Sequence, residues 1–303
     1  MIKAVAIVGP TASGKTELSI NVADDVFEVI SADSVQVYRY MDIGSSKPSL
    51  SERRGVSHHL IDIIDPDYHF TAGDYCIKAF EAFRDITGRD KIPLIVGGTG
   101  FYIDSFCNGI DEVPDIDESI RSAAAFEYDN GSQESLYEEL QKNDPEFASK
   151  VHINDRQRVI RGISVFRDTG KPLSGFFGLK KREINFETLF IGLYIEKESL
   201  QKRIDLRVDF MIKNGLVEEV EKLRRMGYQT SLNSMQSIGY SEVNRYIDGL
   251  ITLEDAVGEI KHNTKKYAKK QMTWFKKNKS IIWFSPDEIK KIPDIIKSWL
   301  NKH

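Results

Sequence analysis

The feature that most constrains this chain of 303 residues is an octapeptide close to its amino terminus. Residues 9–16 have the sequence GPTASGKT, which matches the phosphate-binding loop pattern G-x4-G-K-[S/T]. Residues 4–8 before it are all apolar, as in a strand that is covered on both faces of a parallel sheet. Residues 17–22 after it predict a helix whose positive end points at the loop. This order of strand, loop and helix predicts an α/β fold with an anion site.

The loop predicts a diphosphate or triphosphate ligand but does not specify the reaction. Its glycines allow backbone N–H groups to turn inward around phosphate, Lys15 supplies a mobile positive charge, and the Thr16 hydroxyl can bind Mg²⁺. The alternative is a glycine turn that matches the pattern by chance, which the flanking strand and helix disfavour. The loop residues predicted to bind diphosphate or nucleotide are Gly9, Pro10, Thr11, Ala12, Ser13, Gly14, Lys15 and Thr16.

Composition is that of an ordinary soluble globular protein, with 41% hydrophobic and 29% charged residues. Because the formal net charge is −4, any nucleic-acid site has to be a local patch. The sequence shows neither a secretory signal nor a membrane span, so we expect a cytoplasmic protein without membrane association. Cys76 and Cys107 lack metal-ligand spacing and are expected to be buried thiols.

Two further predicted strands end in polar or glycine-rich segments. Residues 27–33 predict a strand that delivers Asp33 at its carboxyl end, and residues 92–96 predict another that leads into Gly-Gly-Thr-Gly at 97–100. Ligands of open α/β sheets bind at this edge, and Thr99 is the side chain there that can form a hydrogen bond. A further strand is expected at 58–65, where the paired histidines have a structural function rather than binding a metal.

The segment from about residue 109 to 183 differs from the rest, because polar residues dominate it and strand patterns are absent. We expect a helical insertion at 111–185 that divides the core into residues 1–110 and 186–303. Arg156, Arg158 and Arg161 would crowd one side of a helix within it. They form either a solvated charged face or a contact with a phosphate backbone.

The second part of the core carries further basic residues. Residues 197–226 predict one amphipathic helix, which presents Arg203 and Arg207 on the same face. Residues 259–279 predict a helix with eight lysines and no acidic residue after Glu259, interleaved with aromatic residues. In a protein of net negative charge this stripe indicates a nucleic-acid interface, and a solvated face is the alternative. The lysines are Lys261, Lys265, Lys266, Lys269, Lys270, Lys276, Lys277 and Lys279.

Taken together, the motifs resemble those of the tRNA dimethylallyltransferase (isopentenyl-tRNA transferase) family, from about residue 3 to residue 284. Any one of them is weak, but their shared order is specific. In chain order they are GPTASGKT (9–16), DSVQVY (33–38), MDIG (41–44), KP (47–48), HHL (58–60), VGGTG (96–100), Asn154-Asp155 with Arg158 and Arg161, IGY (238–240) and QMTWF (271–275).

The resemblance implies a P-loop NTPase-like core with a tRNA-binding helical insertion. It implies that dimethylallyl diphosphate alkylates N6 of the adenine 3′ to the anticodon, with release of diphosphate and with Mg²⁺ as the cofactor. The loop would then hold the leaving diphosphate, and no ATP would be needed. The partner is the tRNA anticodon stem-loop, and we expect a monomer.

The resemblance also implies functions for individual residues. Asp33 accepts the proton of the adenine amine as the C–N bond forms, with a second-shell magnesium ligand as the alternative function. Thr99 contacts the target base or its sugar, while Arg121 and Arg207 approach the diphosphate. Lys15, Asp33, Thr99 and Arg121 are thus the predicted catalytic residues. The predicted tRNA-binding residues are Asp33, Ser34, Val35, Gln36, Thr99, Arg121, Gln157, Arg158, Val159, Ile160, Arg161, Gln236, Gly239 and Tyr240.

The chain departs from the family pattern at five positions. Gly162 and Ser164 stand where alanine and glutamate are usual, and Ser241 replaces a basic residue. Lys265 and Lys270 stand where arginine is common, and lysine lacks the two-pronged phosphate contact. We therefore expect altered tRNA affinity or specificity rather than lost activity.

Two other functions remain open at this point. A P-loop kinase for a small metabolite explains the loop and Asp33 but not the basic helix. An ATP-switched RNA-binding protein explains the loop and the helix, but it gives no reason for Thr99 and Asp33 to converge at one sheet edge.

Overall fold

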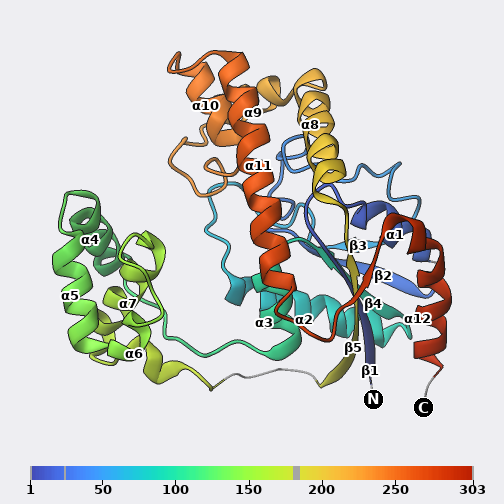
Figure 1. Ribbon diagram of the computed structural model, residues 1–303, viewed down its shortest axis with the longest axis horizontal. Coiled ribbons are helices and arrows are strands. Elements are labelled where there is room, and N and C mark those ends of the chain that lie inside the picture. The colour runs from blue at the N-terminus through green and yellow to red at the C-terminus, as the bar shows by residue number, and fades with distance from the viewer. Residues whose placement is uncertain (1, 24, 180–184, 302–303) are drawn as a thin grey trace. The chain divides into compact units, whose positions relative to one another are not determined.

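The computed structural model describes residues 2–23, 25–179 and 185–301. It forms two compact units: Met1–Cys107 together with Glu183–His303, and the segment Asn108–Arg182 between them. Figure 1 shows the two units, coloured by residue number along the chain. The expected boundary at 110/111 lies close to the first division, and the expected boundary at 185/186 adjoins residues 180–184, which lie outside the described residues.

The first unit is built on a parallel sheet of six strands in the order β3-β2-β4-β1-β5-β6. Val8 and Ala32 both pair with Gly97, so β1, β2 and β4 end at the same level. The segments that follow these strands therefore start side by side at one edge of the sheet. The strands are β1 Ile2–Val8, β2 Phe27–Ala32, β3 His58–His59, β4 Ile92–Gly97, β5 Phe186–Leu193 and β6 Ile282–Phe284.

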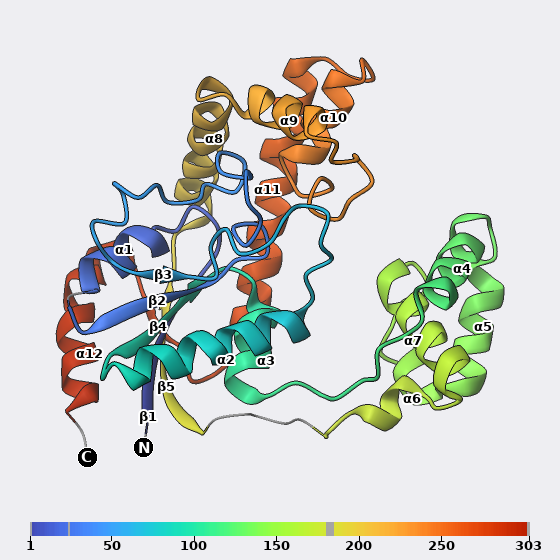
Figure 2. The same cartoon turned by 180° about the vertical axis from the view of Figure 1, so that it is seen from behind.

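Helices cover both faces of this sheet (Figures 1 and 2). On one face, α1 (Lys15–Val22) and α12 (Ile292–Leu300) pack on alternate strand residues such as Val5 and Ile7. On the other face, α2 (Ala72–Gly88) and α3 (Gly100–Asn108) form an aromatic cluster with β5. Its rings are those of Tyr75, Phe80, Phe83, Tyr102, Phe106 and Phe186. The predicted parallel sheet flanked by helices is confirmed.

The strand expected at 58–65 is mostly wrong, because only its first two residues pair as β3. Leu60 and Asp62 have positive φ values of 63° and 58°, which an extended strand cannot contain. The chain continues as a loop that contacts the preceding segment through one isolated β-bridge, between Tyr38 and Ile64, and through backbone hydrogen bonds such as that from the Asp62 N–H to the Gln36 carbonyl (3.2 Å).

The two histidines of β3 make structural contacts. Nδ1–H of His58 donates to the Val56 carbonyl (2.8 Å), and Nε2–H of His59 donates to the buried carboxylate of Glu28 (2.7 Å). Burial alone would raise the pKa of Glu28, but hydrogen bonds from Arg89, His59 and Lys91 outweigh it and lower the pKa to about 2. Nowhere in residues 2–23, 25–179 and 185–301 do three or more His, Cys, Asp or Glu side chains form a metal-binding group.

The helix expected over 197–226 is wrong in one respect, because the chain forms two helices there. α8 (Lys197–Lys213) ends at Asn214, and α9 (Leu216–Arg225) begins after Gly215, whose φ of +97° a glycine adopts without strain. α10 (Tyr240–Ile247) leads into α11 (Leu253–Phe275), the predicted basic helix. α11 starts earlier than expected, because Thr252 and Asp255 form a capping box. It lies side by side with α8 (Figures 1 and 2).

The second unit has its own hydrophobic core. Its helices are α4 (Glu118–Asp129), α5 (Gln133–Asn143), α6 (Pro145–Ala148) and α7 (Arg156–Thr169), followed by a 3-10 turn, η1 (Leu173–Phe176). Ala124, Leu136, Leu140, Val159 and Ile163 are among the buried residues of this core. Residues 108–179 contain no strand, so the predicted helical character is confirmed there.

Candidate active site

The glycine-rich loop forms a cradle between β1 and α1. Gly14, with a φ of +91°, caps the amino terminus of α1, and Ala12 also has a positive φ of 61°. Gly9 lies so close to β5 that a Cβ atom on it would be 2.9 Å from the Leu193 carbonyl oxygen. Glycine is therefore required where the loop leaves the sheet.

Two cations and one carboxylate meet at the cradle. The pKa of Lys15 is lowered to about 7, mainly by burial and also by Arg207, while Asp33 opposes this shift. The pKa of Arg207 is likewise lowered by burial and raised by Asp33. Lys15 Nζ donates to the Pro10 carbonyl at 2.7 Å. An anion bound here would balance the excess positive charge, as expected of a diphosphate site.

A single pocket joins the cradle to the ends of β2 and β4. Its walls come from the loop, from the segments after both strands, and from α8 and α11. The lining residues include Thr11, Lys15, Thr16, Asp33, Gln36, Gly98, Arg207, Tyr267 and Gln271. The structure thus brings together the predicted residues Lys15, Thr16, Asp33 and Arg207, which are far apart in sequence.

Asp33 lines this pocket, and backbone N–H groups hold one oxygen of its carboxylate. Oδ1 accepts hydrogen bonds from the backbone N–H groups of Val35 (2.9 Å) and Gln36 (3.2 Å), which fix the side chain. Within the part of the chain that the structure describes, no hydrogen bond reaches Oδ2. A carboxylate held by one oxygen and open at the other is suited to accept a proton from a ligand.

Thr99 connects the segments after β2 and β4. Its Oγ1 accepts from the Ser34 N–H (3.1 Å), and its own N–H donates to the Ala32 carbonyl (3.1 Å). Its side chain is also hydrogen-bonded to Tyr267. Thr99 therefore supports the segment that carries Asp33 and contacts Tyr267 of the pocket wall, although it is not itself one of the lining residues.

Two pocket residues of α11, Tyr267 and Gln271, were not assigned a function from the sequence. Gln271 is 6% exposed; its Nε2 donates to the Gly98 carbonyl (2.9 Å), and its Oε1 accepts from the Thr11 N–H (2.8 Å). A Cβ atom on Gly98 would be 2.2 Å from Gln271 Nε2, which explains that glycine. Burial, and to a lesser extent Asp33, raises the pKa of Tyr267. Their i, i+4 spacing on one helix was a signal, but the lysines of the same helix obscured it.

The donor set at Thr16 fits Mg²⁺ that binds together with a diphosphate. Mg²⁺ in phosphate sites takes few protein ligands and completes its shell with phosphate oxygens and water. The Thr16 side chain is exposed next to Lys15 and lines the pocket, so a hydroxyl ligand is available there. A group of acidic side chains is not required for this mode of binding.

The remaining predicted tRNA contacts in the first unit differ in exposure. Ser34, Val35 and Gln36 directly follow Asp33, and Gln236 is exposed. Tyr240 is fully buried, and its hydroxyl donates to Glu219 (2.7 Å). The side chain of Tyr240 therefore serves the interior of the protein, and the predicted contact of this residue with tRNA stays a prediction. Gly239, also buried, donates its N–H to Glu242 Oε2 (2.8 Å).

In the second unit, the predicted tRNA contacts lie on α4 and the start of α7. Gln157 and Arg158 are exposed, whereas the side chains of Val159 and Ile160 pack in the core. The predicted contacts of this segment with tRNA stay predictions. Burial lowers the pKa of Arg161, and the nearby Arg121 contributes to this shift. The predicted approach of Arg121 to the diphosphate stays a prediction.

The expected cluster of three arginines is incomplete. Arg156 binds Asp129 through two hydrogen bonds of 2.7 Å and 2.5 Å. Arg158 lies 3.5 Å from Asp155. Arg121 lies 3.6 Å from Glu118, and Arg161 forms no ion pair with another described residue, so Arg161 is the better candidate for a phosphate contact in this unit.

Two departures from the family pattern have a structural basis. A Cβ atom on Gly162 would lie 2.6 Å from Leu140 Cδ1 and 3.0 Å from the Phe147 ring, so glycine allows close packing of α7. Lys265 forms an ion pair with Asp205 of α8 (2.6 Å). Ser164 is fully buried, and nothing in the structure explains its hydroxyl, which has no hydrogen-bond partner among the described residues.

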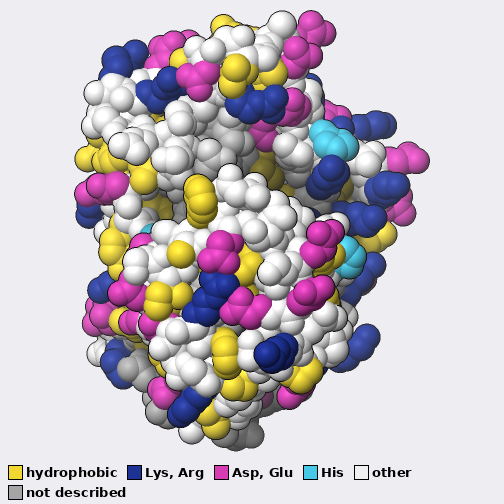
Figure 3. Space-filling view, turned by 90° about the vertical axis from the view of Figure 1, so that its left-hand side faces the viewer, with side chains coloured by type: hydrophobic (Ala, Val, Ile, Leu, Met, Phe, Trp, Pro, Cys, Tyr) yellow, Lys and Arg dark blue, Asp and Glu magenta, His cyan; other side chains and the backbone are white. Residues whose placement is uncertain are grey.

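The lysines of the basic helix differ in their surroundings. Lys261 and Lys265 pair with Asp209 and Asp205 on α8, so two of the eight lysines are engaged within the protein. Figure 3 shows one face of the molecule, on which basic and acidic side chains are interspersed. The exposed lysines of α11 and the residues after it are Lys266, Lys269, Lys270, Lys276, Lys277 and Lys279.

Among the described residues, every helix is too short or too polar to cross a lipid bilayer.

Comparison with known proteins shows which family this chain resembles in sequence. The sequence model of the IPP transferase family matches residues 36–278, and that of the isopentenyl transferase family matches residues 2–65. A tRNA dimethylallyltransferase 2 of Geotalea uraniireducens is 46% identical over 93% of this chain and 92% of its own length. A tRNA dimethylallyltransferase of a Thermoanaerobacter species is 43% identical over 98% of this chain and 96% of its own.

Solved structures agree with these relatives. The full-length tRNA isopentenylpyrophosphate transferase of Bacillus halodurans is 37% identical, with a TM-score of 0.73 over 99% of this chain and 97% of that one. A eukaryotic dimethylallyltransferase crystallised while acting on tRNA is 30% identical, with a TM-score of 0.79 over 94% of this chain and 74% of that one. The P-loop NTPase-like core predicted from the sequence is thereby confirmed.

Proposed function

The chain belongs to the IPP transferase family, and we infer that it is a tRNA dimethylallyltransferase, an enzyme that attaches a dimethylallyl group to N6 of the adenine 3′ to the anticodon. The observation that carries the inference for this chain is the position of Asp33. Its open carboxylate oxygen shares one pocket with the cations of the cradle, Lys15 and Arg207. A site for a departing anion thus lies beside a site for a proton acceptor.

We propose dimethylallyl diphosphate as the donor. The adenine N6 attacks C1 of the allyl group, the C–O bond to diphosphate breaks, and N6 loses one proton. Because negative charge gathers on the leaving group, the loop amides, Lys15 and Arg207 favour bond cleavage. Mg²⁺ held by Thr16 and the diphosphate would offset further charge.

Asp33 accepts the N6 proton in this proposal. Its carboxylate is fixed by the backbone N–H groups of Val35 and Gln36, so no reorganisation is needed during the reaction. Thr99 stands beside Asp33 and is available for the target base or its sugar. The adenine has to leave its stack to reach such a pocket.

We also propose how the protein binds tRNA, its oligomeric state and its location in the cell. The exposed lysines of α11 and Arg161 of α7 would bind the phosphates of the anticodon stem-loop. We propose a monomer in the cytoplasm, where its tRNA substrate is available.

One assay tests the function. The protein is incubated with unmodified tRNA, Mg²⁺ and either dimethylallyl diphosphate or ATP, and the tRNA is analysed by mass spectrometry. We expect one dimethylallyl group on N6 of the adenine next to the anticodon, with the allylic donor only. Phosphoryl transfer to a small metabolite from ATP, or ATP-dependent RNA binding without covalent change, would each replace this proposal.

A further inference from the structure

The loop after β2 is attached to a distant part of the chain by one buried carboxylate. Glu219 of α9 is 9% exposed. Its Oε2 accepts from the backbone N–H groups of Asp42 (3.0 Å) and Ile43 (2.8 Å). Its Oε1 accepts from the Gly44 N–H (3.1 Å) and from the Tyr240 hydroxyl (2.7 Å). Three consecutive backbone amides thus converge on one side chain.

Hydrogen bonds alone stabilise the negative charge of the Glu219 carboxylate. No ion pair involving Glu219 occurs within residues 2–23, 25–179 and 185–301. Consecutive N–H groups that point at one anion form a nest, and each charge-assisted bond is stronger than a neutral one. The arrangement specifies one position for residues 42–44, because removing any partner leaves a buried charge or amide unsatisfied.

Close packing between Gly44 and the Tyr240 ring holds the same part of the loop in place. A Cβ atom on Gly44 would lie 2.5 Å from Cε2 of the Tyr240 ring. The ring therefore fits directly against the backbone of the loop, and only glycine permits this approach. Two sequence motifs that the reaction itself does not use, Met-Asp-Ile-Gly at 41–44 and Ile-Gly-Tyr at 238–240, meet here.

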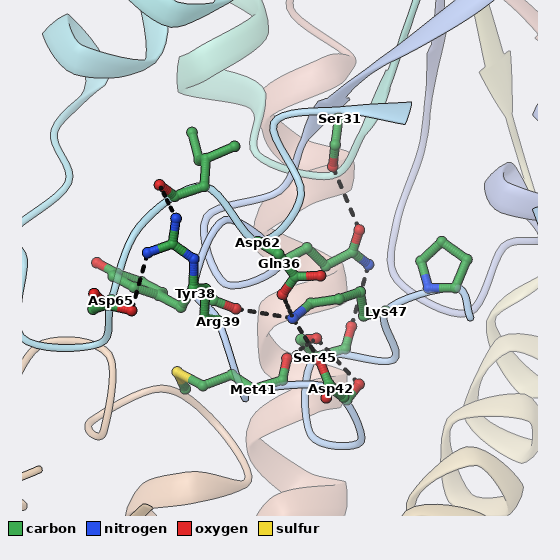
Figure 4. Close-up of polar contacts among 12 residues, drawn as sticks. Ser31, Gln36, Tyr38, Arg39, Met41, Asp42, Ser45, Lys47, Asp62 and Asp65 are labelled. Atoms are coloured by element: carbon green, nitrogen blue, oxygen red, sulfur yellow. Dashed lines mark hydrogen bonds and ion pairs between the residues drawn. The ribbon is translucent and has the colours of Figure 1, made fainter. Parts of the chain in front are cut away.

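The loop from residue 33 to residue 48, called the 33–48 loop below, is braced internally. Lys47, with 4% of its side chain exposed, donates to the Tyr38 carbonyl (2.9 Å) and pairs with Asp42 (2.6 Å) and Asp62. Gln36 Nε2 donates to the carbonyls of residues 45 and 46 (3.3 and 3.4 Å). Figure 4 shows the Lys47 ammonium inside the loop, between the Tyr38 carbonyl and the carboxylates of Asp42 and Asp62. A shift at residues 42–44 is therefore transmitted to the rest of the loop.

The 33–48 loop also forms one wall of the active-site pocket. Its contributions to the lining are Asp33, Gln36, Ser46 and Pro48. We infer that Glu219 is a positioning residue: by holding residues 42–44 it sets the place of this wall, and with it the proton acceptor, relative to the cradle. The inference rests on the proposed function, because it assigns Glu219 to the transfer step.

The test uses Glu219→Gln, which keeps the size of the side chain but places an amide donor where N–H groups need an acceptor. We expect single-turnover transfer from dimethylallyl diphosphate to tRNA to fall at least tenfold and KM for tRNA to rise. The affinity for inorganic diphosphate, measured by calorimetry, should change less than twofold. Hydrogen exchange at residues 42–44 should accelerate. Tyr240→Phe, which keeps the three backbone bonds, should lose less than threefold in transfer.

The matched control is Glu28→Gln. Glu28 is another buried carboxylate of the same unit, and it points to the face of β2 opposite to Val29 and Ser31, which line the pocket. This variant should unfold at lower urea concentration while its transfer rate stays within twofold.

Several results would overturn the inference. These are parental transfer by a folded Glu219→Gln protein, a parallel loss of diphosphate affinity, and unchanged exchange at residues 42–44 despite lost transfer. If the parent protein itself transfers nothing, the proposed function fails, and the exchange rates still decide whether Glu219 holds the loop.

Discussion

Replacement of Gln271 should weaken anion binding by the phosphate loop, although Gln271 itself lies outside this loop. This side chain joins three elements, because it accepts from the Thr11 N–H in the phosphate loop and donates to the Gly98 carbonyl after β4. Gln271→Ala removes both of these hydrogen bonds and the side-chain hydrogen bond with Tyr267, and it leaves the Gly98 carbonyl without its Gln271 partner. Each lost bond costs about 1 kcal/mol, and a buried unsatisfied group costs about 1–3 kcal/mol. Since Thr11 is partly exposed and water can replace its partner, we expect a total of about 2–3 kcal/mol.

Part of this cost should appear in ligand binding, because the Thr11 amide belongs to the loop that surrounds the anion. We expect the Kd for inorganic diphosphate to rise about tenfold, which corresponds to about 1.4 kcal/mol. Gln271→Glu separates charge from geometry. It keeps the acceptor for Thr11 but adds a negative charge to the pocket, so its Kd should exceed that of the alanine variant.

Calorimetry with diphosphate and urea unfolding measure the two effects. The control is Thr273→Ala on the same helix, which should affect neither quantity. Among the described residues, the exposed Thr273 hydroxyl bonds only to the Lys269 carbonyl. Parental affinity and parental stability in Gln271→Ala would refute this reasoning. Tighter diphosphate binding by the glutamate than by the alanine variant would refute the argument from charge.

Three further predictions concern pH, salt and packing. Because the folded-state pKa of Glu28 is about 2, below the ordinary glutamate value of 4.5, its stabilisation is complete above about pH 4.5 and is lost as the pH falls toward 2. Glu28→Gln should remove this acid-dependent part, about 1–2 kcal/mol after solvent screening of its partners, from urea unfolding curves recorded at decreasing pH. Exchange of Lys266, Lys269 and Lys270 for glutamine should reduce the slope of log K for tRNA against log salt by about 2. An unchanged slope would assign these lysines to a solvated face. Gly162→Ala should lower the free energy of unfolding by about 1 kcal/mol, because overpacking against Leu140 outweighs the gain in helix propensity, and a raised melting temperature would contradict this.

The part of the site that follows strands could be predicted from sequence alone. A buried strand followed by a glycine-rich loop is a local pattern, and the carboxyl ends of neighbouring parallel strands necessarily meet at one edge. The positions of Lys15, Asp33 and Thr99 follow from these two facts. Asn214 and Gly215 were a local signal for the break between α8 and α9. We missed this signal because the amphipathic pattern continues on both sides of the break.

The part of the site that depends on tertiary packing could not be predicted in this way. Gln271 lies 260 residues from the loop amide that it accepts from, and Glu219 lies 175 residues from Gly44. Neither side chain belongs to a local motif that specifies a hydrogen-bond partner. The lysines of α11 illustrate the same limit, because the sequence cannot show that Asp205 and Asp209 of α8 face two of them.

Single-turnover transfer by Asp33→Asn tests most directly whether the carboxylate and the cradle act on one reaction. Asparagine keeps an oxygen for the Val35 and Gln36 amides but cannot take up the N6 proton. With tRNA and diphosphate binding confirmed by calorimetry, we expect transfer of the dimethylallyl group to fall about a hundredfold or more. Transfer at the parental rate by a protein that binds both substrates normally would contradict the account.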